Sequence, residues 1–432
     1  MKAIRIGLLG VGTVGQSVAR ALLERGENLG RSAGARLALT RAAVRDPSRP
    51  RPISGAKLST DPMEVVAADD VDVVVELIGG EEPAHKLIAA ALERGKPVVT
   101  ANKRVVARHG PELEKLAAKK GVELRYEAAV GGGIPLIAPL NDDLVANRIL
   151  ELRAIINGTT NFVLTEMAQG SDLEAALARA QAAGYAEADP RDDIDAVDAG
   201  DKLAILVRLA FGAECTPERV FRQGIRGLEA KDLAYGRELG YVLKLVAIAR
   251  RTPKGVEARV HPAFLPAEHP LARVDGAQNA VHLLGDLCGP VMFSGLGAGG
   301  PATASAVLAD IGHIARRLAL GDPVPPPPLR GAAPELCPMD EVRTRCYFRL
   351  AVDDVPGVFA QLTGVLARHE IGLASVLQRE PGMLGSAEVV LLTYGAREAA
   401  LAEAEAELAK LPCTRAVKAR IRVDAPDRGA KQ

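Results

Sequence analysis

The sequence lacks net formal charge, because 54 lysine and arginine residues balance 54 aspartate and glutamate residues. A chain with no dominant sign of charge has no general field that attracts nucleic acid or an anionic membrane surface. We therefore expect no nucleic-acid partner and no membrane partner. A small neutral or zwitterionic substrate fits this charge balance better.

Cysteines are few, and none of them forms a C-x-x-C pair. Their number is odd, they are widely scattered, and no histidine stands near them at metal-ligand spacing. The pattern predicts reduced thiols in a cytoplasmic protein. The five residues are Cys215, Cys288, Cys337, Cys346 and Cys413.

Long hydrophobic runs are also missing. The most apolar helical segment, "LAILVRLAF", is interrupted by Arg208 and is much shorter than the about 20 residues that span a bilayer. A first strand is expected to begin at about Ala3, which leaves no room for a secretory signal. We expect a soluble, cytoplasmic protein.

Apolar strands alternate with amphipathic helices over residues 1–130. This rhythm is typical of a parallel sheet covered on both faces, so the fold class is α/β with a Rossmann-type nucleotide-binding domain. Residues 131–300 are expected to form an α+β substrate-binding and dimerisation domain, and the helix predicted over 301–320 returns to the first domain. The proline-rich segment 321–342 predicts an extended linker. Residues 343–425 follow the order β-α-β-β-α-β.

The hexapeptide "GVGTVG" has the spacing G-x-G-x-x-G between a strand and a helix. In such a turn the first glycine bends the chain, the second lets the backbone approach a pyrophosphate, and the third lets the helix pack on the strand. The alternative is a structural glycine turn. Dinucleotide binding is the better interpretation because both flanking elements are right, and the predicted residues are Gly10, Val11, Gly12, Thr13, Val14 and Gly15.

The end of the second strand carries Arg45 followed by Asp46. An acidic residue at this position binds the ribose 2′-hydroxyl of NAD, whereas an arginine favours the 2′-phosphate of NADP. Since Arg45 comes first after the apolar run, NADP is favoured. Use of NAD, or of both cofactors, stays open, as does an Arg45 that is only a solvated strand end.

Ordered motifs along the chain resemble those of the homoserine dehydrogenases. They are "GVGTVG", "VVELIGG", "VVTANK", "EAAVGGGIP", "NGTTNF", the segment 184–202, and "GLGAGG" followed by "TASAVLAD". The resemblance implies the reversible, NAD(P)-dependent interconversion of L-homoserine and L-aspartate 4-semialdehyde, in the route to threonine and methionine. It also places Gly79, Lys103 and Gly297 at the cofactor.

Segment 184–202 carries seven carboxylates and one lysine, Lys202. Asp189 before Pro190 predicts a helix start, and a helix that runs on from there places Asp198 and Lys202 four residues apart on one face. By spacing alone, an exposed salt bridge on an acidic surface is the better interpretation of this pair.

The resemblance gives these residues catalytic roles. It implies that Lys202 exchanges the substrate proton, with Asp198 as a further catalytic group, and that Lys103 holds substrate beside the nicotinamide. It also implies that Glu187 and Asp193 bind or orient the substrate. Carboxylates of this kind suit the ammonium group of homoserine.

Two residues depart from the family pattern. Ala196 stands where a glycine is usual, and Asp201 stands beside the lysine where a basic or neutral residue is commoner. We interpret Ala196 as a helical residue, for which alanine is the better helix former. An inactive nucleotide-binding regulator, or a different Rossmann dehydrogenase acting on an amino acid, are the alternatives.

The motif "EAAVGGGIP" resembles a monovalent-cation site of the family. That resemblance implies a sodium ion held by Glu127 and by the backbone oxygens of Val130, Gly132 and Ile134. A glycine-rich turn that binds no ion is the alternative.

The C-terminal block resembles an ACT domain through its D-x-P-G-V-F-A core, which begins at Asp354. Such modules bind small amino acids, commonly as paired copies. The resemblance therefore implies an amino-acid effector, with threonine as first candidate near Asp354, Pro356 and Gly357. It also implies a homodimer or homotetramer. The alternative is a module used only for contacts between subunits.

Overall fold

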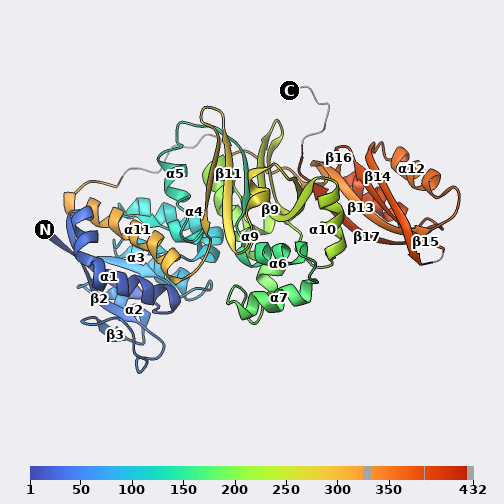
Figure 1. Cartoon of the computed structure of the whole chain (residues 1–432). Helices are drawn as coiled ribbons and strands as arrows, with labels where there is room; N and C mark the ends of the chain where they lie inside the picture. Colours follow the sequence, from blue (N-terminus) through green and yellow to red (C-terminus); the bar gives the residue numbers. More distant parts are fainter. Residues whose placement is uncertain (325–332, 384, 426–432) are drawn as a thin grey trace. The chain divides into compact units, whose positions relative to one another are not determined.

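The computed structural model describes residues 1–324, 333–383 and 385–425 (Figure 1). The chain divides into two compact units, each assembled from separate stretches of sequence. Unit 1 comprises Met1–Ile149, Asp201–Glu218 and Leu283–Pro334, and unit 2 comprises Leu150–Gly200, Arg219–His282 and Glu335–Gln432. Among the described residues, none of the helices has both the length and the apolar character that crossing a membrane requires.

A six-stranded parallel sheet forms the centre of unit 1, with the order β3-β2-β1-β4-β5-β6. The order reverses between β1 and β4, which is where open α/β sheets bind ligands at their carboxyl edge. The strands are β1 (Lys2–Leu9), β2 (Ala35–Ala43), β3 (Lys57–Ser59), β4 (Val73–Glu76), β5 (Val98–Thr100) and β6 (Leu124–Arg125). The Rossmann-type domain expected from the sequence is confirmed.

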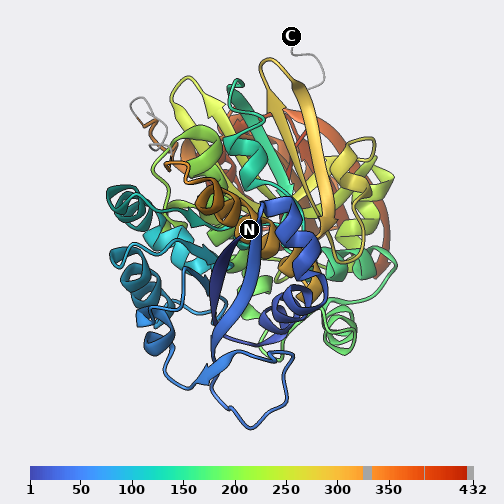
Figure 2. The same cartoon turned by 90° about the vertical axis from the view of Figure 1, so that its left-hand side faces the viewer.

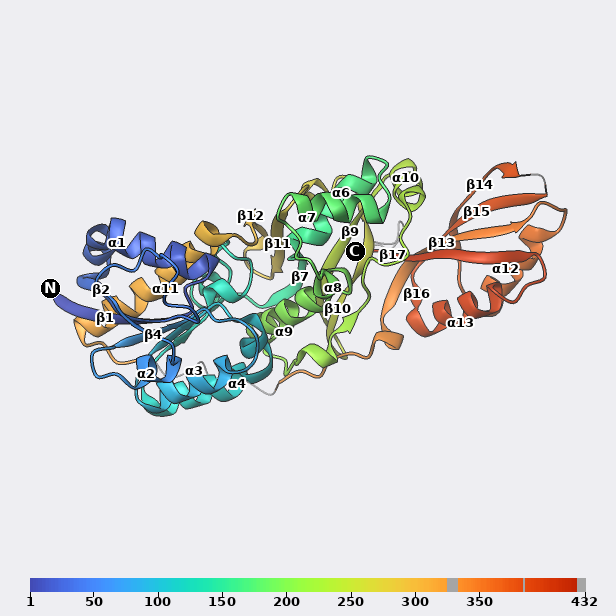
Figure 3. The same cartoon turned by 90° about the horizontal axis from the view of Figure 1, so that it is seen from below.

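Helices cover both faces of this sheet, as Figure 3 shows most clearly. Helices α1 (Thr13–Ala33) and α11 (Gly300–Leu320) pack on one face around Ile6, Leu8 and Ile311. On the other face lie α2 (Pro62–Ala67), α3 (Ala84–Glu93) and α4 (Lys103–Lys120). The remaining elements of unit 1 are η1 (Glu127–Ala129), α5 (Ile137–Asn141) and β12 (Gly289–Leu296). Figure 2 shows α1 beside the sheet from a second side.

Unit 2 contains a mixed sheet with the order β11-β7-β9-β10-β17-β13-β15-β14. Its strands are β7 (Ile149–Ile155), β8 (Phe221–Arg222), β9 (Tyr241–Thr252), β10 (Gly255–Pro266), β11 (Gln278–Gly285), β13 (Arg343–Asp353), β14 (Leu373–Met383), β15 (Ser386–Thr393), β16 (Ala396–Arg397) and β17 (Thr414–Val423). Its helices are α6 (Gly158–Ala168), α7 (Leu173–Ala182), α8 (Arg191–Ile194), α10 (Ala230–Glu238), η3 (Pro270–Arg273), η4 (Met339–Glu341), α12 (Val358–Arg368) and α13 (Glu398–Leu408). Helix α9 (Val197–Phe211) begins among unit 2 residues and continues among unit 1 residues, and η2 (Pro217–Arg219) follows it.

The C-terminal segment runs β13-α12-β14-β15-α13-β17, with the short β16 before α13. Helices α12 and α13 pack on one face of these strands (Figure 3). The segment joins the rest of unit 2 through parallel pairing of β17 with β10. A buried ion pair reinforces this contact, because Arg349 Nε on β13 donates to Asp232 Oδ1 on α10 at 2.7 Å.

The proline-rich linker expected over residues 321–342 lies in part outside the described residues. Its later portion pairs with the start of β10 through a parallel bridge between Leu336 and Val256. The amide of Val256 at the start of β10 donates to the carbonyl of Glu335 at 2.8 Å, and the amide of Cys337 donates back to Val256 at 2.9 Å. The two units do not separate residues 343–425 from the rest of unit 2. The four-part division of the chain therefore stays a prediction.

Candidate active site

The glycine turn after β1 has the close approaches that its motif predicts. Gly10 has a φ of +92°, and a Cβ there would lie 2.7 Å from the carbonyl oxygen of Leu77. A Cβ on Gly15 would lie 2.2 Å from the carbonyl oxygen of Gly10, so α1 can pack here only without a side chain. Gly12 faces open space. These three environments suit a turn, a helix contact and an approaching pyrophosphate.

Val11 precedes Gly12, the N-cap of α1, and Thr13 and Val14 lie in the first turn of this helix. Helix N-termini present unpaired amide donors and a positive dipole end, which together favour a phosphate.

Arg45 lies two residues beyond β2 and is exposed. Among the described residues it forms no ion pair. The carboxylate of the adjacent Asp46 is already engaged, since it accepts from the Ser48 hydroxyl at 2.6 Å and pairs with Arg49 at 3.2 Å. The hydrogen bonds from Ser48 lower the pKa of Asp46. Of the two candidates, Arg45 therefore has the more available side chain.

A cavity of about 280 Å³ within unit 1 brings several expected site residues together. Its lining includes both candidate lysines, Lys103 and Lys202, although 99 positions separate them in the sequence. The expected cofactor residues Val14, Gly79 and Gly297 line it as well. Glycine turns and two cations thus share one small cavity.

A buried hydrogen-bond network holds two loops at this cavity. Glu76, at the end of β4, accepts from the amide of Ile78 at 2.7 Å and from the Thr100 hydroxyl at 2.6 Å. Asn102 caps α4 and donates from Nδ2 to the carbonyl of Gly80 at 2.6 Å. Burial raises the pKa of Glu76. Neither Glu76 nor Asn102 was assigned a role from the sequence, because the partners of these side chains include Thr100 on the neighbouring β5 and Gly80 in the loop after β4.

Lys202 is 9 % exposed and lies on α9, which is fixed against α4. Arg208, two turns further on, donates to the carbonyl of Val106 at 2.9 Å, and it packs where Gly110 leaves room for its guanidinium. Arg108 of α4 pairs with the fully buried Asp201 at 3.6 Å. Asp201, which departs from the family pattern, is thus an attachment point between the helices that carry the two lysines.

Three polar residues of unit 2 form a second cluster. Asn157 caps α6 by accepting from the amide of Thr160, and its Nδ2 donates to Asp193 Oδ1 at 2.7 Å and to Asp198 Oδ2 at 2.8 Å. One amide group therefore holds two carboxylates side by side. Glu187 is exposed in the loop before α8, and the described residues give its carboxylate no contact with this pair. Asn157 is a further residue that the sequence analysis left without a role in the site.

The expected continuous helix from Asp189 to Lys202 is wrong. The structure has the short α8, a break, and then α9, with Asp198 near the start of α9 and Lys202 one turn later. The break occurs at Ala196, which has a φ of +60°. Glycine is usual in this left-handed region because it has no Cβ to clash. The interpretation of Ala196 as a helical residue is therefore wrong as well.

The loop after η1 places the residues expected to hold a cation. The Glu127 carboxylate is buried and accepts from the amides of Leu136, Ile137 and Ala138 at 2.6 to 2.8 Å. Among the described residues, the carbonyls of Val130, Gly132 and Ile134 accept no hydrogen bond, whereas that of Gly131 accepts from Ile134. A Cβ on Gly132 would lie 2.4 Å from the carbonyl oxygen of Gly297, so the two glycine loops meet closely.

Comparison with known proteins assigns the family. The family "Homoserine dehydrogenase, NAD binding domain" matches residues 10–127, and "Homoserine dehydrogenase" matches residues 135–311. The chain is 41 % identical to the homoserine dehydrogenase of Neisseria gonorrhoeae, over 96 % of this chain and 97 % of that protein.

Solved structures agree with the sequence relatives. A homoserine dehydrogenase from Thiobacillus denitrificans superposes with a TM-score of 0.93 at 43 % identity, covering 98 % of this chain and 99 % of that one. A hyperthermophilic archaeal homoserine dehydrogenase in complex with NADPH superposes with a TM-score of 0.62 at 29 % identity, covering 72 % of this chain and 96 % of that one. The chain therefore belongs to the homoserine dehydrogenase family and is an oxidoreductase that uses a nicotinamide cofactor.

Proposed function

We propose that Lys202 is the proton donor and acceptor in the interconversion of L-homoserine and L-aspartate 4-semialdehyde, the reaction of this family. The observation that carries the proposal is the 280 Å³ cavity, in which Lys202 and Lys103 line the same space as Gly79 and Gly297. A substrate oxygen in such a space has two lysines within reach and a cofactor turn beside it.

The chemistry requires one proton acceptor and a positioned substrate. The nicotinamide cofactor, when bound, accepts a hydride from the alcohol carbon of homoserine. Lys202 takes the hydroxyl proton in that direction and returns it to the oxygen when the aldehyde is reduced. Lys103 supplies a second cation, which holds the substrate through a charge-assisted hydrogen bond.

Carboxylates of unit 2 are proposed to bind the substrate ammonium group. We assign Asp193 and Asp198 to the ammonium group of homoserine, with Glu187 as a further carboxylate for the same cation. The support is the shared hydrogen-bond donor Asn157, whose amide holds the first two carboxylates side by side. Charge-assisted hydrogen bonds of this kind are stronger than neutral ones.

NADP is the proposed cofactor. The exposed guanidinium of Arg45 stands at the end of β2, where a 2′-phosphate is recognised. A structural relative is described in complex with NADPH, which agrees with this choice. The test is kcat/KM with NADP⁺ and with NAD⁺ at saturating homoserine. A clear preference for NAD⁺ contradicts the assignment.

A monovalent cation such as sodium fits the loop after η1. The carbonyls of Val130, Gly132 and Ile134 have unused lone pairs, and the Glu127 carboxylate lies at the same loop. Oxygen ligands alone suit a hard cation. Replacing sodium in the buffer by a bulky organic cation is expected to lower the thermal midpoint. An unchanged midpoint argues for a turn without an ion.

The C-terminal segment is proposed to act as an ACT-like module that binds threonine. A cavity of about 570 Å³ is lined by Asp354, Pro356 and Gly357, the residues of the motif. Gly357 has a φ of +90° and caps α12, so backbone amides are available for a carboxylate. Exposed apolar side chains lie beside this cavity, namely Val355 and Phe359. They support pairing of modules in a homodimer or homotetramer, which light scattering can measure.

The direct assay of the proposed function follows the nicotinamide absorbance in both directions. Homoserine is expected to support reduction of NADP⁺, and aspartate semialdehyde is expected to support oxidation of NADPH. If the protein binds NADPH but neither substrate changes the nicotinamide absorbance, the alternative of an inactive regulator is favoured.

A further inference from the structure

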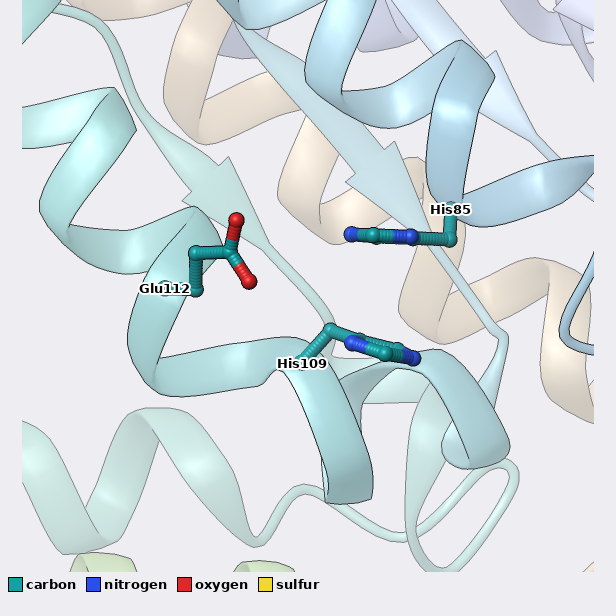
Figure 4. A group of neighbouring side chains, drawn as sticks. All are labelled: His85, His109 and Glu112. Atoms are coloured by element: carbon teal, nitrogen blue, oxygen red, sulfur yellow. The ribbon is translucent and has the colours of Figure 1, made fainter.

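Two histidines and a glutamate of unit 1 form a cluster outside the proposed active site. His85 lies in the first turn of α3, whereas His109 and Glu112 lie on α4 (Figure 4). One ligand atom from each residue lies within 4.8 Å of the other two. None of these three residues was expected from the sequence to belong to a site. His109 and Glu112 are three residues apart on one face of a helix, and packing of α3 on α4 adds the third group.

The imidazole rings are held parallel, with centroids 4.0 Å apart and an angle of 14° between their planes. In Figure 4 the outer end of the His85 ring, which carries Nε2, points toward Glu112. This Nε2 is buried and has no hydrogen-bond partner among the described residues. A buried ring nitrogen without a partner is costly unless a ligand uses it.

The opposite ring atoms have carboxylate partners. Nε2 of His109 lies 2.7 Å from Glu81 Oε1, and Nδ1 of His85 lies 3.7 Å from Glu82 Oε1. A histidine that donates one ring N–H to a carboxylate presents the lone pair of its other nitrogen, which is the arrangement that supports metal-bound histidines. The hydrogen bond to Glu81 thus orients the His109 ring with Nδ1 available for coordination, whereas the 3.7 Å separation of His85 from Glu82 is too long for a hydrogen bond.

We propose that His85, His109 and Glu112 bind a borderline divalent transition metal, with zinc as the representative ion. Two imidazole nitrogens and one carboxylate oxygen are ligands that zinc prefers over magnesium or calcium. Zinc bonds of about 2.0 to 2.2 Å bring ligand atoms closer together than they lie here. Glu112 is exposed, so its side chain can rotate inward without displacing packed neighbours.

The site would link α3 to α4, the helix that begins at Lys103. Glu81, which orients His109, also lies 3.8 Å from Arg108, the partner of Asp201. The metal would therefore stiffen the helix pair beside the cavity. This proposal is independent of the catalytic role of Lys202, because none of its ligands lines the cavity.

The test is calorimetric titration of zinc chloride into chelator-treated full-length protein that carries no polyhistidine tag. We expect one zinc per chain and a higher thermal midpoint with zinc. His85→Ala and His109→Ala are expected to weaken binding at least about 100-fold, and Glu81→Gln about 10-fold or more through the lost orientation of His109. His313→Ala, which removes a histidine from α11, is the matched control and should leave binding unchanged.

Three results would overturn the proposal. The first is that the wild type gives no one-to-one zinc isotherm. The second is that the double variant His85→Ala/His109→Ala binds zinc as tightly as the wild type. The third is that the His313→Ala control loses as much zinc affinity as the ligand variants. Glu112→Gln changes only an exposed side chain, so a loss of zinc affinity in this variant is not explained by misfolding. Unchanged zinc affinity in that variant is a fourth result that would overturn the proposal.

Discussion

Ala196 has a φ of +60° and is fully buried between α8 and α9. In the left-handed region the Cβ of an L residue crowds the following carbonyl oxygen, which costs roughly 1–2 kcal/mol. Sequence periodicity cannot reveal such a residue, because a break of two residues between helices leaves the spacing of apolar positions almost intact. The break nevertheless fixes where α9 begins, and so where Asp198 and Lys202 lie.

The strain at Ala196 predicts a contrast between two alanine-to-glycine changes. Ala204→Gly, in the buried interior of α9, should lower the free energy of unfolding through lost methyl burial and helix propensity. Ala196→Gly loses a similar methyl burial but relieves the strain. We expect Ala196→Gly to be about 1–2 kcal/mol less destabilising than Ala204→Gly in urea unfolding. Equal losses would mean that Ala196 is an ordinary helical residue.

Asp310 on α11 gives a second prediction for a single residue. Its Oδ2 accepts from the amide of Glu127 at 2.8 Å, and burial raises its pKa to about 7. Because the unfolded carboxyl ionises near 3.8, the folded state binds the extra proton between those values, and stability falls as pH rises through that window.

Asp310→Asn keeps an acceptor for the Glu127 amide and removes the titration. Between pH 5 and pH 7 the wild type should therefore lose roughly 2 kcal/mol of unfolding free energy relative to this variant. The measurement is urea unfolding of both proteins across that range. Parallel pH profiles would show that Asp310 ionises normally in the folded state.

At the scale of elements, helix starts carry much of the site. Asn102 caps α4 at Lys103, and Asn157 caps α6 beside Asp193 and Asp198. The residues of "NGTTNF" include cap-type side chains that are visible in the sequence, because capping is a local property. The sequence could not predict that the same Asn157 amide reaches Asp193 and Asp198, which lie 36 and 41 positions away.

The two roles of Asn157 can be separated by mutation. Asn157→Ser keeps an oxygen that can cap α6 but loses the amide donor, so the two like-charged carboxylates lose the group that holds them. We expect a KM for homoserine about tenfold higher or more, with the NADPH Kd and the thermal midpoint close to wild type. Asn157→Ala should show the same KM defect and lose about 1 kcal/mol more from the missing cap. An unaltered KM in Asn157→Ser would mean that the amide does not position the substrate carboxylates.

Across the whole molecule, the sequence predicted the Rossmann-type sheet and the β-α-β-β-α-β order correctly, since both depend on local periodicity and glycine spacing. The sequence did not predict contacts between segments that are distant along the chain. Examples are the pairing of β17 with β10, the burial of Arg349 against Asp232, and the approach of His85 to His109. Each of these contacts depends on how complete helices and strands pack together, and a short sequence motif carries no information about that packing.

These contacts change how the proposed regulation should be tested. Removing residues after about 320 would strip β17 from β10 and leave Asp232, which is fully buried, without Arg349. Breaking a buried ion pair on one side is strongly destabilising, by about 3–5 kcal/mol. A truncated enzyme that ignores threonine could therefore be a misfolded one.

Point substitution in the effector cavity avoids this problem. Threonine at millimolar concentration is expected to inhibit the wild type, because a ligand that prefers one arrangement of the assembly shifts it. Asp354→Asn should raise the inhibitory concentration about tenfold or more without changing uninhibited kcat. Asp340→Asn, an exposed change outside the cavity, is the control. Insensitivity of the wild type to threonine would leave the module with a role in subunit contacts.

The rate of homoserine oxidation by the Lys202→Ala variant tests the central claim most directly. That claim is that the Lys202 side chain accepts the hydroxyl proton of the substrate. We expect kcat to fall at least about 100-fold, the usual scale for loss of a positioned acid or base, while the NADPH Kd changes only a few-fold. Lys119→Ala, at the exposed end of α4, should retain wild-type turnover. Near-normal kcat in a folded Lys202→Ala enzyme would contradict the account, whereas a large kcat loss with intact cofactor binding is the result it predicts.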